Sequence, residues 1–297
     1  MRMNSSLAGS TRHQSDAKPE DWEATYRQIV LYDLAADIEL GFFLAYYRNF
    51  AVPSIAATLH RNGEITQRPI KRSYDTAIVT YELICNGLDS DRGRHMIRLL
   101  NHVHRHVPGN NDDFLYVLLT LLVVPIRWAR EHGWRVPTPA EESAATRFYQ
   151  ELGVRMNIGT IPATFPEAEQ FFDDYERKNI AHSPGGAELM ASTVQILKSR
   201  LPAPARPLAK TMLTAMFDDD RLTDALGLPR ATQLSKATLN AVLKARNAIH
   251  RRRPLSTKPH FVPGKEGSSL YPNGYRLDDI GPENIMTPAS EPNHEPS

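Results

Sequence analysis

Residues 111–133, NDDFLYVLLTLLVVPIRWAREHG, are the most apolar stretch of the chain, and their length decides which kind of helix they form. The apolar part from Phe114 to Trp128 has 15 residues, contains Pro125 and directly follows acidic residues. A membrane-spanning helix needs about 20 apolar residues, whereas shorter stretches usually form buried core helices. We therefore predict a buried core helix, with Asn111 or Asp112 as its N-cap, and no transmembrane segment.

The segments around this stretch also have apolar residues at helical spacing. Residues 21–50 read as helix, Pro53 and Gly63 bound the next helix, and Gly87 and the Pro108-Gly109 pair end two more. We find no hairpin signal and no repeat. The predicted fold class is therefore all-α, with one globular helical domain over residues 21–253. Further helices are predicted over residues 139–152, 166–179, 186–200, 206–218 and 235–252.

The two ends of the chain have a different composition. Residues 1–20 are polar and lack periodicity, and residues 254–297 hold eight of the 22 prolines without an apolar period. Segments of this kind bury too little apolar surface to offset the entropy of ordering. We therefore expect a disordered N-terminus over residues 1–20 and a disordered, proline-rich tail over residues 254–297.

Charge and cysteine content exclude several classes of protein. The chain has 35 Lys and Arg against 34 Asp and Glu, so bulk charge gives no argument for a nucleic-acid partner or an anionic membrane. Cys85 is the only cysteine, which excludes an internal disulfide or a cysteine-cluster metal site and is typical of a reducing compartment. The N-terminal residues do not resemble a signal peptide. We therefore expect a cytoplasmic protein.

Three histidines alternate in residues 101–109, NHVHRHVPG. In a strand, His102, His104 and His106 would share one face and could form a zinc-type triad. Helical spacing over residues 96–107 instead places Met96, Ile97, Leu100, Val103 and Val107 on one apolar stripe. The helix is the better interpretation, and it separates the three imidazoles.

In this helix His104 lies in the apolar stripe, and His102 and His106 lie four residues apart on the polar side. A histidine on an apolar face is either a satisfied core residue or a ligand, for example of haem iron. The pattern alone favours the core residue, so the ligand hypothesis needs a second observation.

The second observation comes from residues 68–76, RPIKRSYDT, in which Arg72 and Thr76 are four residues apart and project from one side of a helix start. Arg72 could have a functional role as a cation, or it could cap the helix or pair with Asp75. Thr76 could be a functional hydroxyl, or it could bond its own helix backbone.

Several motifs together resemble a known family, the haem-dependent oxygenase domain that rubber oxygenase (latex clearing protein) shares with the MpaB-type oxygenases. The similarity runs from about Tyr46 to near residue 176 and covers most of the predicted domain. It is carried by FAVPSIA (50–56), the Arg72–Thr76 pair, GLDSDRG (87–93), the histidine run with the apolar helix after it, and ELGVRMNIGTIPATFPEAEQFFDDYE (151–176).

The resemblance implies a buried haem b pocket in which His104 is the axial ligand of the iron and Arg72 and Thr76 flank the haem. It also implies that the partners are dioxygen and an apolar small molecule of isoprenoid, lipid or secondary-metabolite type, with oxidative cleavage of a C=C bond as the suggested reaction. Two departures stand out. Asp75 stands where rubber oxygenase has a lysine, and the glutamate proposed as catalytic base of that enzyme has no clear counterpart in this sequence, in which Glu64 is the nearest acid.

Two other classes of function stay open at this point. The chain could be a non-catalytic helical protein that binds haem or a lipid, because the sequence offers no unambiguous general base. It could also be a helical interaction module without a cofactor. The Soret absorbance of the purified protein separates these possibilities.

Overall fold

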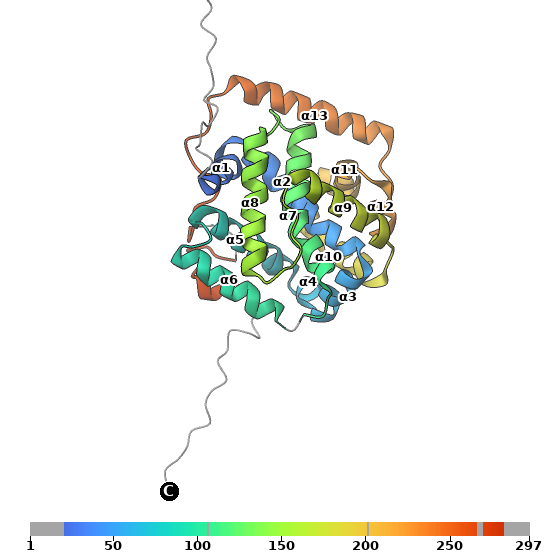
Figure 1. Ribbon diagram of the computed structural model, residues 1–297. Helices are drawn as coiled ribbons and strands as arrows, with labels where there is room; N and C mark the ends of the chain where they lie inside the picture. Colours follow the sequence, from blue (N-terminus) through green and yellow to red (C-terminus); the bar gives the residue numbers. More distant parts are fainter. Residues whose placement is uncertain (1–20, 106, 201, 266–269, 282–297) are drawn as a thin grey trace, which may run out of the picture.

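The computed structural model describes residues 21–105, 107–200, 202–265 and 270–281, and over these residues the fold is helical without any β-ladder (Figure 1). The prediction of an all-α domain is confirmed. The α-helices are α1 (Trp22–Gln28), α2 (Ala35–Arg48), α3 (Pro53–Asn62), α4 (Glu64–Gln67), α5 (Pro69–Asn86), α6 (Asp91–His104), α7 (Asn111–His132), α8 (Pro139–Arg155), α9 (Phe165–Asn179), α10 (Pro184–Arg200), α11 (Ala209–Met216), α12 (Asp220–Ala225) and α13 (Gln233–Arg252).

The apolar stretch that opens the sequence analysis forms α7, the central helix of the domain. Its buried side chains lie all around its axis, as expected for a helix enclosed by other helices. The predicted caps were wrong by one residue or two, because Asn110 is the N-cap and its side chain accepts from the Asp113 amide at 2.8 Å. Within the described ranges, no helix combines the length and apolar content that a membrane span requires.

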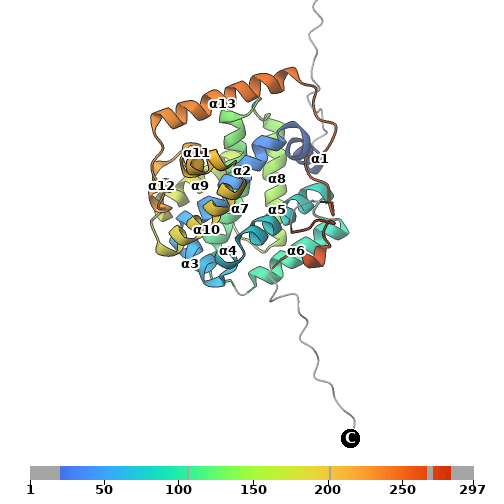
Figure 2. The ribbon, with the colours of Figure 1, turned by 180° about the vertical axis from the view of Figure 1, so that it is seen from behind.

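Helix α2 packs on α7 more extensively than any other pair of helices, and it lies behind α7 in Figure 1 and in front of it in Figure 2. The crossing is close at Gly41, where a Cβ atom would lie 2.3 Å from Pro125 Cα. Glycine is therefore needed on α2 where the proline ring of α7 approaches. The predicted helix of residues 21–50 is interrupted before this point by a π-helical segment, Ile29–Asp33.

The histidine run forms the end of α6, which confirms that His102 and His104 belong to a helix. His102 is exposed and His104 is half-buried. Helix α6 ends at His104, which is three residues earlier than predicted. The predicted position of His106 lies outside the described residues.

The expected disorder of the chain after Pro254 does not hold for its described part. Phe261 stacks on Tyr81 with the ring centroids 5.0 Å apart, Tyr275 donates to the Glu82 carboxylate at 2.5 Å, and Ile280 is fully buried. These anchors are isolated aromatic and apolar residues, so they produce no apolar period that a sequence pattern could reveal. The expected disorder of residues 1–20 and 282–297 lies outside the described residues.

Candidate functional site

His104 is held in one tautomer at the end of α6. Its Nδ1 atom lies 2.7 Å from the Leu100 carbonyl oxygen, and only a protonated Nδ1 can donate to that acceptor. Burial and the positive charge of Arg72 lower the pKa of His104, against the raising effect of this bond, with burial as the largest cause. At neutral pH the imidazole is therefore uncharged, and Nε2 carries the lone pair that a metal ion requires.

Arg72 lies on α5, near His104 and near Tyr46 of α2. Its positive charge lowers the pKa of both residues, although burial still raises the pKa of Tyr46 to about 12. Among the described residues, no hydrogen bond or ion pair holds the Arg72 guanidinium. Its proposed alternative partner, Asp75, is bound instead by Lys71 at 2.6 Å. A half-buried guanidinium of this kind is suited to an anionic ligand group.

Asp75 therefore faces away from Arg72, toward the C-terminal segment. Besides Lys71, its carboxylate accepts from the Tyr271 hydroxyl at 2.7 Å and from the Gly281 amide at 3.0 Å. Lys71 in turn donates to the Gly281 carbonyl oxygen at 3.2 Å. Asp75 thus anchors the C-terminal segment to α5.

Thr76 follows Arg72 by one helical turn and lines a cavity of about 280 Å³ between α2, α5 and α7. Its hydroxyl donates to the Arg72 carbonyl oxygen at 2.8 Å, which is the backbone bond that the sequence analysis named as the alternative. The oxygen can still accept a hydrogen bond from a group in the cavity. The two roles of Thr76 are therefore compatible.

The cavity is lined by three helices and by His260 and Phe261 of the C-terminal segment. Both α2 and α5 contribute side chains at spacings of three and four residues, which places them on one face of each helix. The α2 residues are mainly aromatic, whereas α5 provides four small side chains and two tyrosines. From α5 the lining residues are Ser73, Tyr74, Thr76, Ala77, Thr80 and Tyr81, from α2 they are Glu39, Phe42, Phe43 and Tyr46, and from α7 they are Val117, Thr120 and Leu121.

Two polar atoms of the cavity lining have no hydrogen-bond partner among the described residues. They are the hydroxyl oxygen of Tyr46 and Oδ1 of Asn49, both shielded from solvent. Buried polar groups are normally satisfied by protein, water or ligand, since an unsatisfied one costs about 1–3 kcal/mol. The apolar cavity therefore offers a polar contact point to whatever occupies it.

The structure does not bring Arg72, Thr76 and His104 into one cavity. His104 lines a separate hollow of about 360 Å³ with Asn101, Phe114 and Met156, whereas Thr76 lines the cavity described above. Phe114 meets the His104 ring edge-on, with the ring centroids 6.1 Å apart. Only Arg72 acts on both regions, through its charge on His104 and on Tyr46.

The sequence analysis did not identify the aromatic residues of α2 as a cavity wall. A signal was present, because Phe42, Phe43 and Tyr46 share one helix face at three- and four-residue spacing. Recognising a cavity wall also requires knowing which faces of α5 and α7 lie across from α2, and the sequence does not show that.

Glu64 and two arginines that follow apolar runs of the sequence make ordinary ion pairs. Glu64 accepts from Arg68 at 2.6 Å within α4 and its cap, Arg127 binds Glu169 and Asp173, and Arg155 binds Asp89 and Glu151. Glu64 does not line the cavity. A general base at this position is therefore not supported.

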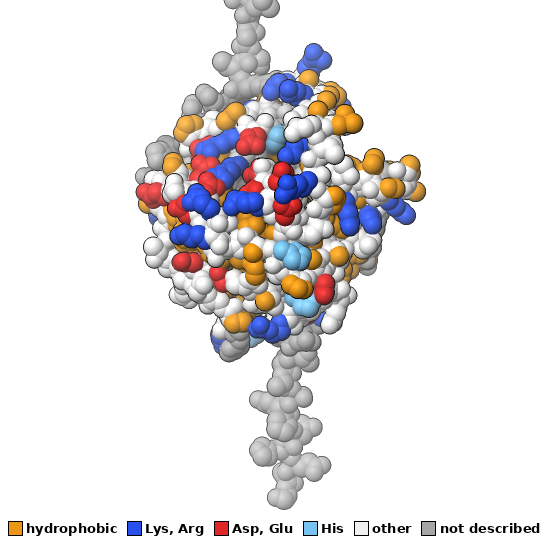
Figure 3. Space-filling view, turned by 90° about the vertical axis from the view of Figure 1, so that its right-hand side faces the viewer, with side chains coloured by type: hydrophobic (Ala, Val, Ile, Leu, Met, Phe, Trp, Pro, Cys, Tyr) orange, Lys and Arg blue, Asp and Glu red, His pale blue; other side chains and the backbone are white. Residues whose placement is uncertain are grey.

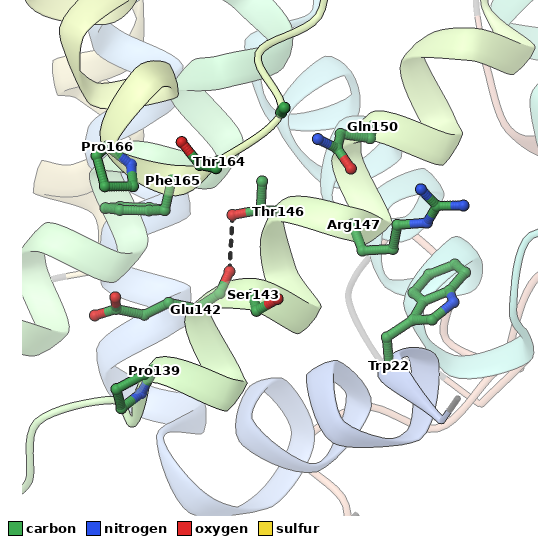
Figure 4. Close-up of a pocket in the computed structure, with 11 residues that line it drawn as sticks. Trp22, Pro139, Glu142, Ser143, Thr146, Arg147, Gln150, Thr164, Phe165 and Pro166 are labelled. Carbon is green, nitrogen blue, oxygen red and sulfur yellow. Dashed lines mark hydrogen bonds between the residues drawn. The ribbon is translucent and has the colours of Figure 1, made fainter. Parts of the chain in front are cut away.

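A larger hollow, of about 820 Å³, lies elsewhere, between α8 and the start of α9 (Figure 4). It is lined by Trp22, Arg147 and Gln150 among others, and Thr146 donates its hydroxyl hydrogen to the Glu142 carbonyl oxygen. None of Arg72, Thr76 and His104 reaches it. Size alone therefore does not mark the site.

Comparison with known proteins gives one family. The family model described as "ER-bound oxygenase mpaB/B'/Rubber oxygenase, catalytic domain" matches residues 34–248. The chain is 23% identical to ER-bound oxygenase mpaB' of Penicillium brevicompactum over 305 residues, covering 80% of the chain and 72% of the relative. It is 22% identical to ER-bound oxygenase mpaB of the same fungus over 277 residues, covering 80% and 71%.

The fold is similar to a solved structure of latex clearing protein in the closed state. The TM-score is 0.56 at 19% sequence identity, and the match covers 84% of this chain and 72% of that chain. At this identity the likeness concerns the fold alone.

Proposed function

Because the chain belongs to the family of ER-bound oxygenase mpaB/B' and rubber oxygenase catalytic domains, we propose that it is an oxygenase that uses haem b and dioxygen to oxidise an apolar small molecule. The observation that carries the haem assignment is the state of His104. Its imidazole is neutral, its Nδ1 is hydrogen-bonded to the Leu100 carbonyl oxygen, and its Nε2 therefore has a lone pair that could bind iron.

The residues present fit haem b by their chemistry. His104 would ligate the iron through Nε2, and Leu100 would hold the ring through its carbonyl oxygen. Arg72 would neutralise a propionate or face the oxygen side, since no described residue pairs with its guanidinium. When bound, haem b would supply the activation of dioxygen.

The cavity beside Thr76 would take the substrate. Its aromatic and aliphatic lining favours an isoprenoid, a lipid or a related secondary metabolite, and oxidative cleavage of a C=C bond is the reaction that the rubber oxygenase resemblance suggests. Tyr46, Asn49 and Thr76 would orient a polar group of that substrate. We further propose that the enzyme works in the cytoplasm, as its single Cys85 favours.

The test is spectroscopic. The purified full chain should show a Soret band, or should acquire one on titration with haemin, and the reduced protein should consume dioxygen when an unsaturated apolar compound is supplied. A colourless protein that fails to take up haemin would refute the proposal. Stoichiometric haem binding without dioxygen consumption would instead favour a non-catalytic haem-binding protein.

A further inference from the structure

We propose that the outer face of α13 docks the protein on a membrane surface rich in anionic phospholipid. This outer face consists of Leu234, Ala237, Ala241, Val242, Ala245, Ala248 and Ile249. The helix lies along the top of the molecule in Figures 1 and 2, with the other helices below it.

The outer face is apolar although it is exposed. Leu234 is 77% exposed, Val242 60% and Ile249 51%, and the four alanines between them are exposed as well. Of the eleven large hydrophobic residues exposed in the described chain, six lie between Leu208 and Leu255. An exposed helix face of this kind is typical of an interaction surface rather than of scattered surface residues.

The inner side of α13 is held to the domain largely by polar contacts. An ordinary surface helix instead turns its apolar side to the domain and its polar side to water. Asn247 donates to the carbonyl oxygens of His132 and Gly133 at 2.8 and 3.0 Å, Arg246 pairs with Asp37, and Arg251 donates to the Trp134 carbonyl oxygen at 2.9 Å. The helix is therefore fixed in an orientation that presents its apolar side outward.

The charge on α13 and its flanks is predominantly positive, although Arg230, Lys236 and Arg246 pair with aspartates of neighbouring segments. Residues 225–265 contain nine Lys and Arg and no Asp or Glu. Lys244, Arg252 and Arg253 are exposed on or directly after α13. In the side view of Figure 3, acidic side chains lie toward the middle and left, and hydrophobic and basic side chains border the upper right. Cations flanking an apolar helix face complement a lipid surface with anionic headgroups.

The occupant that we favour is lipid rather than a second copy of the chain. A second copy would bring the same cations together across a face that holds no acidic residue to balance them. An anionic bilayer balances them with its headgroups and takes the short apolar side chains into the interface. The face is suited to lying on the membrane.

The experiment is flotation of the full chain with vesicles of phosphatidylcholine alone or of phosphatidylcholine mixed with phosphatidylglycerol. The wild-type protein should float with the mixed vesicles, and rising salt should weaken binding. The double variant Val242→Glu/Ile249→Glu should bind at least about tenfold more weakly. Replacing Lys244 and Arg252 by Glu should weaken binding by about fivefold or more for each cation lost.

The matched control is the double variant Val136→Glu/Val154→Glu. Its valines are 62% and 63% exposed but lie outside α13, so it adds the same charges at equally exposed sites. It should bind as the wild type does, and circular dichroism should give all variants the same helical content.

The proposal would be overturned by no flotation with the mixed vesicles, by an equal loss of binding in the control, or by equal binding to the neutral vesicles. A wild-type dimer that Val242→Glu/Ile249→Glu converts to a monomer, without vesicle binding, would overturn it in favour of a contact between copies.

Discussion

At the scale of single residues, His104 and His102 give a matched pair two positions apart on the same helix. His104 is half-buried with its Nδ1 engaged, whereas His102 is exposed. We predict that His104→Ala abolishes or strongly lowers haem content, because it removes the iron ligand, and that His102→Ala leaves it unchanged. Thr76→Ala should retain haem and alter turnover. Arg72→Ala should lower the haem content less than His104→Ala does but more than Thr76→Ala does. The ratio of Soret to protein absorbance measures each effect.

The contrary outcome has its own signature. If His104 is only a core residue, its replacement costs about 1–3 kcal/mol of stability through a cavity and the lost hydrogen bond to Leu100, and bound haem is untouched. If the His104→Ala protein keeps the absorbance spectrum of histidine-ligated haem, His104 is not the iron ligand, and His182 becomes the next candidate.

Cys85 gives a prediction about pH. Burial, and secondarily the negative charge of Glu82, raise the pKa of the Cys85 thiol to about 12. Only the thiolate is nucleophilic, so at pH 8 the native protein should react with iodoacetamide about a thousandfold more slowly than an ordinary cysteine. The rate should still be rising at pH 10. The denatured chain is the control, and comparable rates in the two states would contradict the shift.

At the scale of helices, the crossing of α2 and α7 depends on Gly41. We predict that Gly41→Ala destabilises the protein by about 1–3 kcal/mol or more, because its Cβ would overlap Pro125 and force the helices apart. Urea unfolding measures the loss. The control is Gly159→Ala, whose added Cβ meets Asn111 at an ordinary 3.4 Å. Equal stability of the two variants would show that α2 can shift without cost.

At the scale of the whole molecule, the C-terminal segment is part of the fold. A chain ending at Arg253 loses the Phe261, Tyr271 and Tyr275 anchors, and burial of one Phe side chain alone contributes about 1.5–3 kcal/mol. We predict a lower Tm, by about 2–4 °C for each kcal/mol lost, and faster entry of apolar dyes into the cavity that His260 and Phe261 line.

A chain ending at Gly281 is the control for this deletion, since it retains every one of these contacts. It should melt as the full chain does. If the chain ending at Arg253 also melts at the same temperature, the segment adds no net stability and its contacts only offset the entropy of ordering it.

The sequence by itself determined the helical fold class, the central helix α7, the helical setting of His102 and His104, and the family resemblance. These follow from local properties: apolar spacing of three and four residues, caps, and the Pro and Gly residues that end helices. Each depends on side chains within a few turns of one another, so a linear pattern contains them.

Only the tertiary structure decided the rest. It brought α2, α5, α7 and the C-terminal segment together around a cavity, it placed His104 and Thr76 in separate hollows, and it bound the C-terminal segment through Asp75 and Glu82. It also turned the apolar face of α13 outward and placed cations beside it. The net charge of the whole chain, +1, gives no sign of this local positive charge. The physical reason is common to all four. Which faces meet depends on packing between residues far apart in the chain, and neither composition nor periodicity encodes that pairing.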